Sequence, residues 1–204
     1  MRERRVRTVG VLAVAGLMAG GGSAVAAEAA AAASPAAQPR LAPAAQGAPD
    51  VTVLFGRAVA RTRATRKPLF AKAVVYEADG STANGKPTGS ARGIDRWRFV
   101  FDNYPSHSKF ASATITYASG RFGKVTGIMS PFVEDVQIPK APKMTLPTAV
   151  RRLRAAGYKR SFRFVTLRRP LGPTKVNTLY LFTLTNGHNV AVNTVTGKVS
   201  NFGG

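Results

Sequence analysis

The stretch GSTANGKPTG, residues 80–89, has the spacing G-x-x-x-x-G-K of a loop that binds nucleotide phosphates. Such a loop needs Ser or Thr after the lysine to hold magnesium, and a helix must start there so that its amides face the phosphates. Here Lys86 is followed by Pro87, the residues after it do not start a helix, and the next expected element is a strand around Trp97. We therefore interpret the stretch as a Gly-rich connection between two strands, with Asn84-Gly85 as its turn.

Other residue types that carry chemistry are scarce. His107 and His188 lie in polar, turn-like contexts without cysteine or a pair of carboxylates nearby, so we interpret them as solvated loop residues. No serine lies in a G-x-S-x-G elbow. Adjacent Glu134 and Asp135 would point to opposite faces of an extended segment, and the acids in general are better explained as salt-bridge partners of the arginines than as a glycosidase pair. We expect no catalytic residue, no metal ligand and no cofactor, and a hydrolase with an unrecognised site is left as a minor alternative.

Positive charge dominates the composition. Lys and Arg number 30 against 9 Asp and Glu, which gives a formal net charge of +21. This charge favours acidic partners outside the cell, although solubility explains it equally well. Strand aromatics are expected in the core, so the mixed aromatic and basic surface of a single-strand nucleic-acid binder is not predicted. The candidate binding surface consists of basic residues on expected strands: Lys72, Arg96, Arg98 and Arg163.

The N-terminus has the layout of a secretory signal. A basic segment is followed by a small, apolar run with an A-x-A site at residues 24–26, which predicts that residues 1–27 are removed and that the protein is secreted or associated with the cell envelope. Two arginines at residues 4–5 leave the twin-arginine route open. Residues 28–49 are rich in Ala and Pro and predict a disordered tether. The absence of cysteine excludes disulfide scaffolds, thiol enzymes and Cys-ligated zinc sites.

Two helices of similar sequence are predicted to position the basic surface. AVARTRA at residues 58–64 recurs as AVRRLRA at residues 149–155, and each lies on an apolar stripe at helical spacing. Asp50 is a candidate cap for the first helix, while Thr145 and Gly157 mark the start and end of the second. The stripe of the first helix is Val51, Leu54, Phe55, Ala58, Val59 and Thr62, and that of the second is Leu146, Ala149, Val150 and Leu153.

Strand-like segments follow each helix in the same order. The matched pairs are 67–78 with 159–167, 97–103 with 180–186, 110–120 with 188–197, and 123–127 with 197–201. In the segment 97–103 the aromatic residues alternate with Arg96, Arg98 and Val100, so one face is core and the other is wet. The predicted fold class is α+β, with two tandem repeats that each pack one helix on a three- to four-stranded antiparallel sheet. Whether the two halves share one sheet is left open.

The second half resembles the PepSY domain through AVRRLRAAG (149–157), LYLFTLTNG (179–187) and VAVNTVTGKV (190–199). The first half resembles it through its similarity to the second. Asn193 stands where the family often has Asp, and the helix face is rich in arginine where the family's is acidic. The resemblance implies binding or inhibition of a partner, commonly restraint of an extracellular peptidase. In architecture alone, the tandem units also look like the secreted β-lactamase inhibitory proteins, which are disulfide-bonded.

The predicted organisation has five parts: a signal peptide (1–27), an Ala/Pro tether (28–49), a first PepSY-like repeat (50–130), a Pro-containing linker or edge strand (131–144) and a second repeat (145–204). The predicted function is that of an exported, non-catalytic binding module that inhibits or regulates an extracellular peptidase or another secreted protein. The alternative is a basic protein that binds an acidic polymer of the cell envelope. No specific nucleic acid and no transmembrane span after signal cleavage are expected.

Overall fold

The computed structural model describes residues 48–65, 70–102, 111–172 and 176–203. The predicted signal peptide, all but the last two residues of the predicted tether, and His107 lie outside these ranges. The elements, in chain order, are α1 (Val51–Ala64), β1 (Val74–Ser81), the 3-10 turn η1 (Ala91–Gly93), β2 (Arg96–Asp102), β3 (Ser112–Ala118), β4 (Arg121–Phe122), β5 (Thr126–Ile128), α2 (Leu146–Ala155), β6 (Phe162–Arg168), β7 (Leu179–Leu184), β8 (Asn189–Asn193) and β9 (Val199–Asn201).

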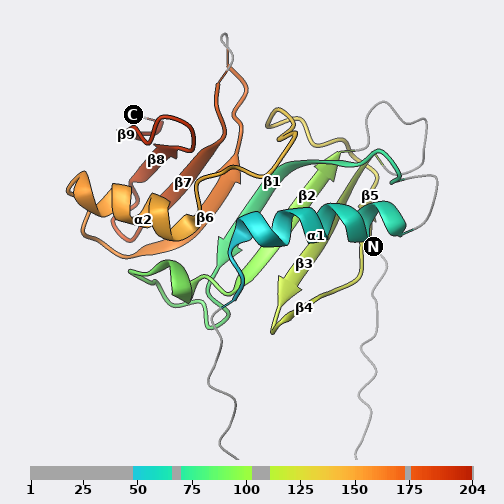
Figure 1. Cartoon of the computed structure of the whole chain (residues 1–204), viewed down its shortest axis with the longest axis horizontal. Helices are drawn as coiled ribbons and strands as arrows, with labels where there is room; N and C mark the ends of the chain where they lie inside the picture. Colours follow the sequence, from blue (N-terminus) through green and yellow to red (C-terminus); the bar gives the residue numbers. More distant parts are fainter. Residues whose placement is uncertain (1–47, 66–69, 103–110, 173–175, 204) are drawn as a thin grey trace, which may run out of the picture. The chain divides into compact units, whose positions relative to one another are not determined.

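All nine strands belong to one antiparallel sheet (Figure 1). Its order is β4-β3-β2-β1-β6-β7-β8-β9, and β5 also pairs with β3. The central pairing is between β1 and β6, so the segments before and after residues 131–144 share a single sheet. This settles the question that the sequence left open and confirms the α+β class.

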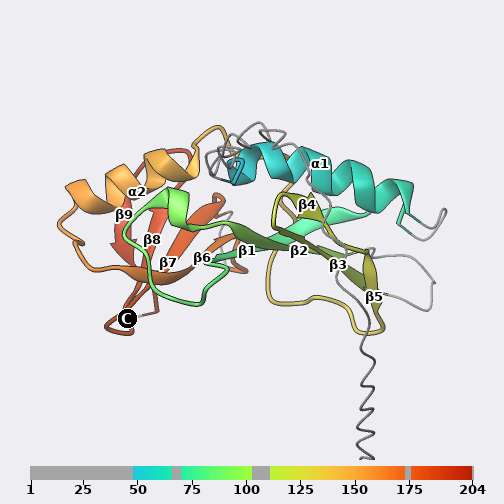
Figure 2. The same ribbon diagram turned by 90° about the horizontal axis from the view of Figure 1, so that it is seen from below.

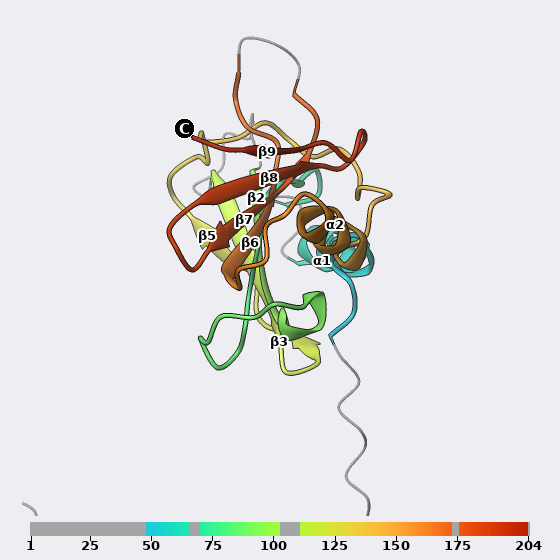
Figure 3. The same ribbon diagram turned by 90° about the vertical axis from the view of Figure 1, so that its left-hand side faces the viewer.

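Both helices lie on the same face of the sheet, as Figures 2 and 3 show from two directions. The strand residues on this helix-covered face are apolar and fully buried, as the alternation in β2 predicted. The largest of them are Trp97, Phe99, Phe101, Phe162, Tyr180 and Phe182. Burying each such ring contributes about 1.5–3 kcal/mol, so this one core accounts for most of the hydrophobic stabilisation of the sheet. The opposite face carries no helix among the described residues and is called the open face below.

The helix ends form where the sequence signals predicted them. Asp50 caps α1 by accepting a hydrogen bond from the Thr52 amide at 2.9 Å. Its second carboxylate oxygen accepts from the Leu146 amide at 2.9 Å, so one side chain serves the first turns of both helices. Thr145 is the N-cap residue of α2, and Gly157, at φ +92°, ends it.

The two central strands each contain a β-bulge. In β1 the register with β2 shifts between Val75 and Glu77, and in β6 the register with β7 shifts between Phe162 and Phe164. A bulge adds one residue to one strand, so the side chains after it exchange faces relative to a regular strand. As a result Glu77 and Phe164 lie on the open face, although each stands two residues after a core side chain.

Two sequence predictions need correction. The segment 50–130 carries five strands and not three or four, because the chain after β3 forms two short strands that both pair with β3. The first strand begins at Val74, well after residue 67, because Phe70 and Ala73 are buried in a turn before it. Of the two alternatives left open for residues 131–144, a linker or an edge strand, the structure has the linker.

The segment 131–144 is a connection with isolated backbone contacts to the sheet. Ile138 is buried and its amide donates to the Val75 carbonyl at 2.7 Å. The Val136 amide donates to the Arg169 carbonyl at 2.8 Å. With three prolines and only isolated bridges, the segment cannot form a continuous ladder.

The stretch 80–89 is a connection between β1 and β2, as predicted. The Gly85 amide donates to the Thr82 carbonyl at 3.2 Å, and the Lys86 amide donates to the Asn84 side chain at 2.9 Å. Gly85 has φ +69°, which glycine adopts without strain. Gly80 has another role, since it lies opposite Trp97 and an added Cβ would meet the indole ring at 2.8 Å.

Candidate binding face

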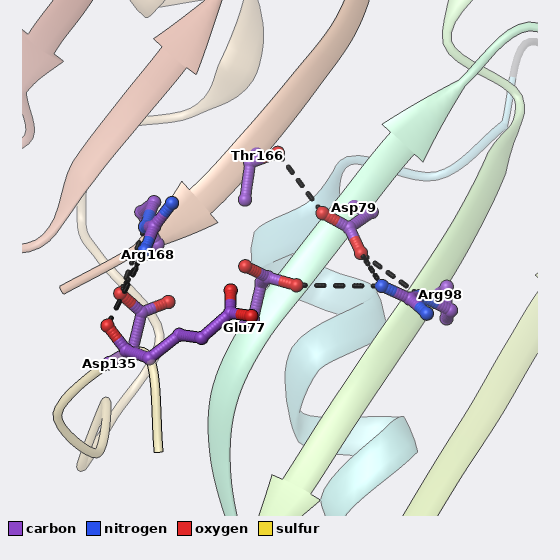
Figure 4. Close-up of polar contacts among 7 residues, drawn as sticks. Glu77, Asp79, Arg98, Asp135, Thr166 and Arg168 are labelled. Carbon is purple, nitrogen blue, oxygen red and sulfur yellow. Dashed lines mark hydrogen bonds and ion pairs between the residues drawn. The ribbon is translucent and has the colours of Figure 1, made fainter. Parts of the chain in front are cut away.

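The open face is organised around three residues of β1 that alternate towards it: Glu77, Asp79 and Ser81. Each has one neighbour on β2 and one on β6 in the register of the sheet. The three rungs are Val100–Glu77–Arg168, Arg98–Asp79–Thr166 and Arg96–Ser81–Phe164. Figure 4 shows most of the polar members and the ion pairs between them. The open face therefore collects side chains from strands more than 80 residues apart in the sequence.

The middle rung is held by direct polar contacts. Arg98 donates to Asp79 Oδ2 through Nη2 at 2.6 Å and through Nε at 3.0 Å. The Thr166 hydroxyl donates to Asp79 Oδ1 at 3.0 Å from the other neighbouring strand. Asp79 thus ties β2, β1 and β6 together, and both of its oxygens are engaged (Figure 4). The Arg98 side chain remains 55% exposed.

Glu77 occupies the buried end of this face. Its side chain is 9% exposed and lies 3.6 Å from Arg98, which already binds Asp79 more closely. Burial, and next the charge of Asp79, raise the pKa of Glu77 to about 8. A hydrogen bond between the two carboxyl groups acts in the same direction because it requires one of them to hold a proton. Glu77 is therefore mainly protonated, and so neutral, at pH 7.

A second ion pair closes the same end. Arg168 donates to Asp135 Oδ1 through Nη2 at 2.7 Å and through Nε at 2.9 Å (Figure 4). The Asp135 side chain is fully buried, and its other oxygen, Oδ2, has no hydrogen-bond partner. Burial raises the pKa of Asp135, while the Arg168 guanidinium opposes that shift. The neighbouring Glu134 is exposed, whereas Asp135 is buried.

The opposite end of the face forms a shallow groove of ≈ 450 Å³. Arg96 and Arg98 line one side of it, and Phe164 and Thr183 line the other, with Ser81 between them. The Phe164 ring is 53% exposed. The remaining polar lining consists of threonine hydroxyls and Asp79. The groove can offer cations, hydroxyls, one carboxylate and one aromatic face to a bound molecule.

The four residues predicted as a binding surface do not all meet. Arg96 and Arg98 line the groove, and Arg163 is the exposed bulge residue beside Phe164. Lys72 is exposed but precedes the far end of β1, roughly 20 Å of strand away from Ser81. Arg98 is also bound to acids, so its charge is largely compensated within the protein.

Two members of the face, Glu77 and Phe164, were missed by reasoning from the sequence. Strict alternation places each on the same face as the core residue two positions earlier, and only the bulges reverse that. Glu77 was considered only as a general salt-bridge partner, and Phe164 fell under the general expectation that strand aromatics lie in the core. A signal does exist in β6, because an arginine between two phenylalanines, followed by Val165, breaks regular alternation.

Other candidate chemistry is sparse in the described part of the chain. His188 is exposed in the turn between β7 and β8. Within the described ranges, no group of three His, Cys, Asp or Glu side chains is arranged to hold a metal ion. None of the helices in those ranges has the length and apolar content to cross a membrane. Asp79 and Asp135 act as salt-bridge partners of arginines, as the sequence suggested for the acids in general.

Comparison with known proteins gives no relative. No family model, no curated protein and no solved structure matches this chain.

Proposed function

We propose that this chain is an exported, non-catalytic binding module whose open face receives an acidic polymer of the cell envelope. The observation that carries the proposal is the groove beside Arg96, which opens on a sheet face that carries no helix in the described part of the chain. An antiparallel sheet with helices on one side leaves its other side available for a partner. Without residues 1–27 the chain keeps 26 Lys and Arg against 8 Asp and Glu, and this net charge of +18 draws acidic partners towards the molecule.

The charges of the open face support an acidic partner. Asp79 and Asp135 are each bound by an arginine, and Glu77 is neutral at pH 7 because of its raised pKa. No ion pair engages Arg96 among the described residues, so its charge is available to a ligand at the edge of the groove. Arg163 is also exposed and lies on β6, two strands away from Arg96 on β2. The groove end of the face is therefore positive, although acids lie at its centre.

In this proposal, the module consists of two copies of one unit, each with a helix and its strands. Support comes from the bulges, which fall at Tyr76 and Arg163, 87 positions apart. The same offset relates Gly80, which opposes Trp97, to Leu167, which opposes Tyr180. It also relates Asp79 to Thr166, and these two residues pair directly with each other. Two copies related by a twofold axis through that pair would produce such a register.

The partner implied by the PepSY resemblance, an extracellular peptidase or another secreted protein, stays a prediction. No described contact favours a protein partner over a polymer, whereas the free positive edge of the groove favours a polyanion. Export itself rests on residues 1–27, which lie outside the described ranges.

Binding of a polyanion to open-face variants tests the proposal. The exported form is titrated with heparin at 50 and 300 mM salt, with a thermal melt for each variant. Arg96→Glu and Arg163→Glu are expected to weaken binding about tenfold each at low salt, and less at high salt. The matched control is Arg61→Glu, which makes the same charge change on an exposed position of α1. Equal losses in all three variants would mean that binding follows net charge and not the open face.

A further inference from the structure

We propose that the open-face groove is a subsite for an acidic sugar, in which the sugar ring packs on Phe164 and its carboxylate binds Arg96. This inference rests on the proposed function and names the class of polymer that the face recognises. Both side chains line the groove and flank Ser81 on neighbouring strands.

The exposure of Phe164 is the first observation behind it. Among the described residues, Phe164 is the one aromatic side chain that is mainly exposed, and it lies in the middle of the sheet on β6. The bulge in β6 turns it away from the core, where Phe162 is fully buried. A large apolar ring in water loses the stabilisation of burial, so a partner that covers it recovers that free energy. The flat C–H face of a pyranose fits such a ring.

The polar lining is the second observation. Ser81, Thr116, Thr166 and Thr183 present hydroxyl groups to the groove. A hydroxyl both donates and accepts hydrogen bonds, and the Asp79 carboxylate accepts them. Sugar hydroxyls need this mixture of donors and acceptors. The groove volume of ≈ 450 Å³ lies in the range of small-ligand sites.

Arg96 supplies the charge selectivity. It stands opposite Ser81, on the side away from Phe164, so a ring over Phe164 and Ser81 brings an acidic substituent towards its guanidinium. Guanidinium and carboxylate groups form paired, charge-assisted hydrogen bonds. A uronic acid has the required ring, hydroxyls and carboxylate in one residue.

A nucleic acid fits this groove less well. Proteins that bind single strands without sequence preference stack successive bases on aromatic side chains, and here a single ring is exposed among the described residues. A sugar hydroxyl can also donate a hydrogen bond to the Asp79 carboxylate in the groove, whereas an ionised phosphodiester has no donor to offer it.

Calorimetric titration of the exported form with four probes tests the inference. The probes are a mannuronate hexamer, the neutral mannose hexamer, inorganic polyphosphate and an oligothymidylate. The parent is expected to bind the mannuronate hexamer more tightly than the other three. Phe164→Ala is expected to weaken mannuronate binding about three- to tenfold and to leave polyphosphate binding unchanged. Arg96→Gln is expected to weaken the binding of both anions.

The controls separate this inference from the proposed function. Arg61→Gln, on the helix layer, should leave all affinities within about twofold. If Phe164→Ala has no effect while Arg96→Gln weakens polyphosphate binding, the sugar subsite is wrong and the polyanion function stands. If oligothymidylate binds more tightly than mannuronate and depends on Phe164, the ligand is a nucleic acid and the inference is overturned. If no open-face variant changes any affinity, both proposals fail.

Discussion

Replacing Glu77 with glutamine is expected to stabilise the protein in alkaline solution and leave it almost unchanged in acid. Glutamine has the shape of a protonated glutamic acid but cannot lose a proton. In the folded chain, burial and the nearby Asp79 raise the pKa of Glu77 from 4.5 to about 8. The folded state therefore binds a proton between these values that the unfolded state has released.

The sign and size follow from proton linkage. Because the pKa of Glu77 is higher in the folded state, the free energy of unfolding falls as pH rises from about 4.5 to about 8, and is then constant. One unit of pKa corresponds to about 1.4 kcal/mol, so the raised pKa sets an upper limit of about 5 kcal/mol. Within this limit, we expect a gain of about 2–4 kcal/mol for Glu77→Gln at pH 9 relative to the parent.

Urea unfolding at pH 4.5, 6, 7.5 and 9 measures this effect. The fluorescence of Trp97, the single tryptophan of the chain, is a suitable probe because the residue is buried in the core. The difference in free energy between variant and parent should be near zero at pH 4.5 and should grow with pH. Glu134→Gln, at a nearby exposed position, should track the parent. A difference that is the same at every pH would refute the raised pKa.

Three further substitutions test the contacts of the fold, each by urea unfolding at pH 7. Arg168→Ala should destabilise the protein by about 3–5 kcal/mol because it leaves the buried Asp135 carboxylate without its partner; a loss below 1 kcal/mol would mean that this ion pair is not formed. Gly80→Ala should cost about 1–3 kcal/mol, since the new methyl group meets the ring of Trp97, and an unchanged stability would contradict the packing of that ring on β1. Asp50→Ala should cost about 1–2 kcal/mol through the loss of hydrogen bonds to the first turns of both helices, whereas Asp50→Asn should recover part of it.

Local patterns were sufficient to predict both helices and most strands. The 3.6-residue spacing of apolar side chains gave the buried faces of α1 and α2, and the alternation around Trp97 gave the core face of β2. Asp50, Thr145 and Gly157 gave the helix ends, because capping is a contact between residues close in sequence. The alternation around Trp97 also placed Arg96 and Arg98 on the face of β2 that points away from the core, and both side chains line the groove of the open face.

The candidate site needed information that no short segment contains. Asp135 binds Arg168, which lies 33 positions later in the sequence. Asp79 accepts a hydrogen bond from Thr166, 87 positions later, because β1 and β6 pair in the middle of one sheet. Alternation cannot predict which strands become neighbours, since every amphipathic strand offers the same backbone groups to any other. The sequence left one sheet and two separate units equally open for this reason.

The bulges decided which side chains form the binding face. Alternation in the sequence determined that each strand has an apolar face and a polar face, and it correctly assigned the residues of β2. It gave no reason to exempt Phe164 from the general expectation that strand aromatics lie in the core, because a period of two does not include the extra residue of a bulge. In the folded sheet, Phe162 and Val165 both pack in the core, and the chain accommodates them with one unpaired residue, Arg163, which turns Phe164 outward. The sequence by itself determined the composition, the charge and the helical and strand periods. Only the tertiary structure placed Glu77 and Phe164 on the open face, because the packing of β1 and β6 against their neighbours makes a bulge more favourable than a regular ladder.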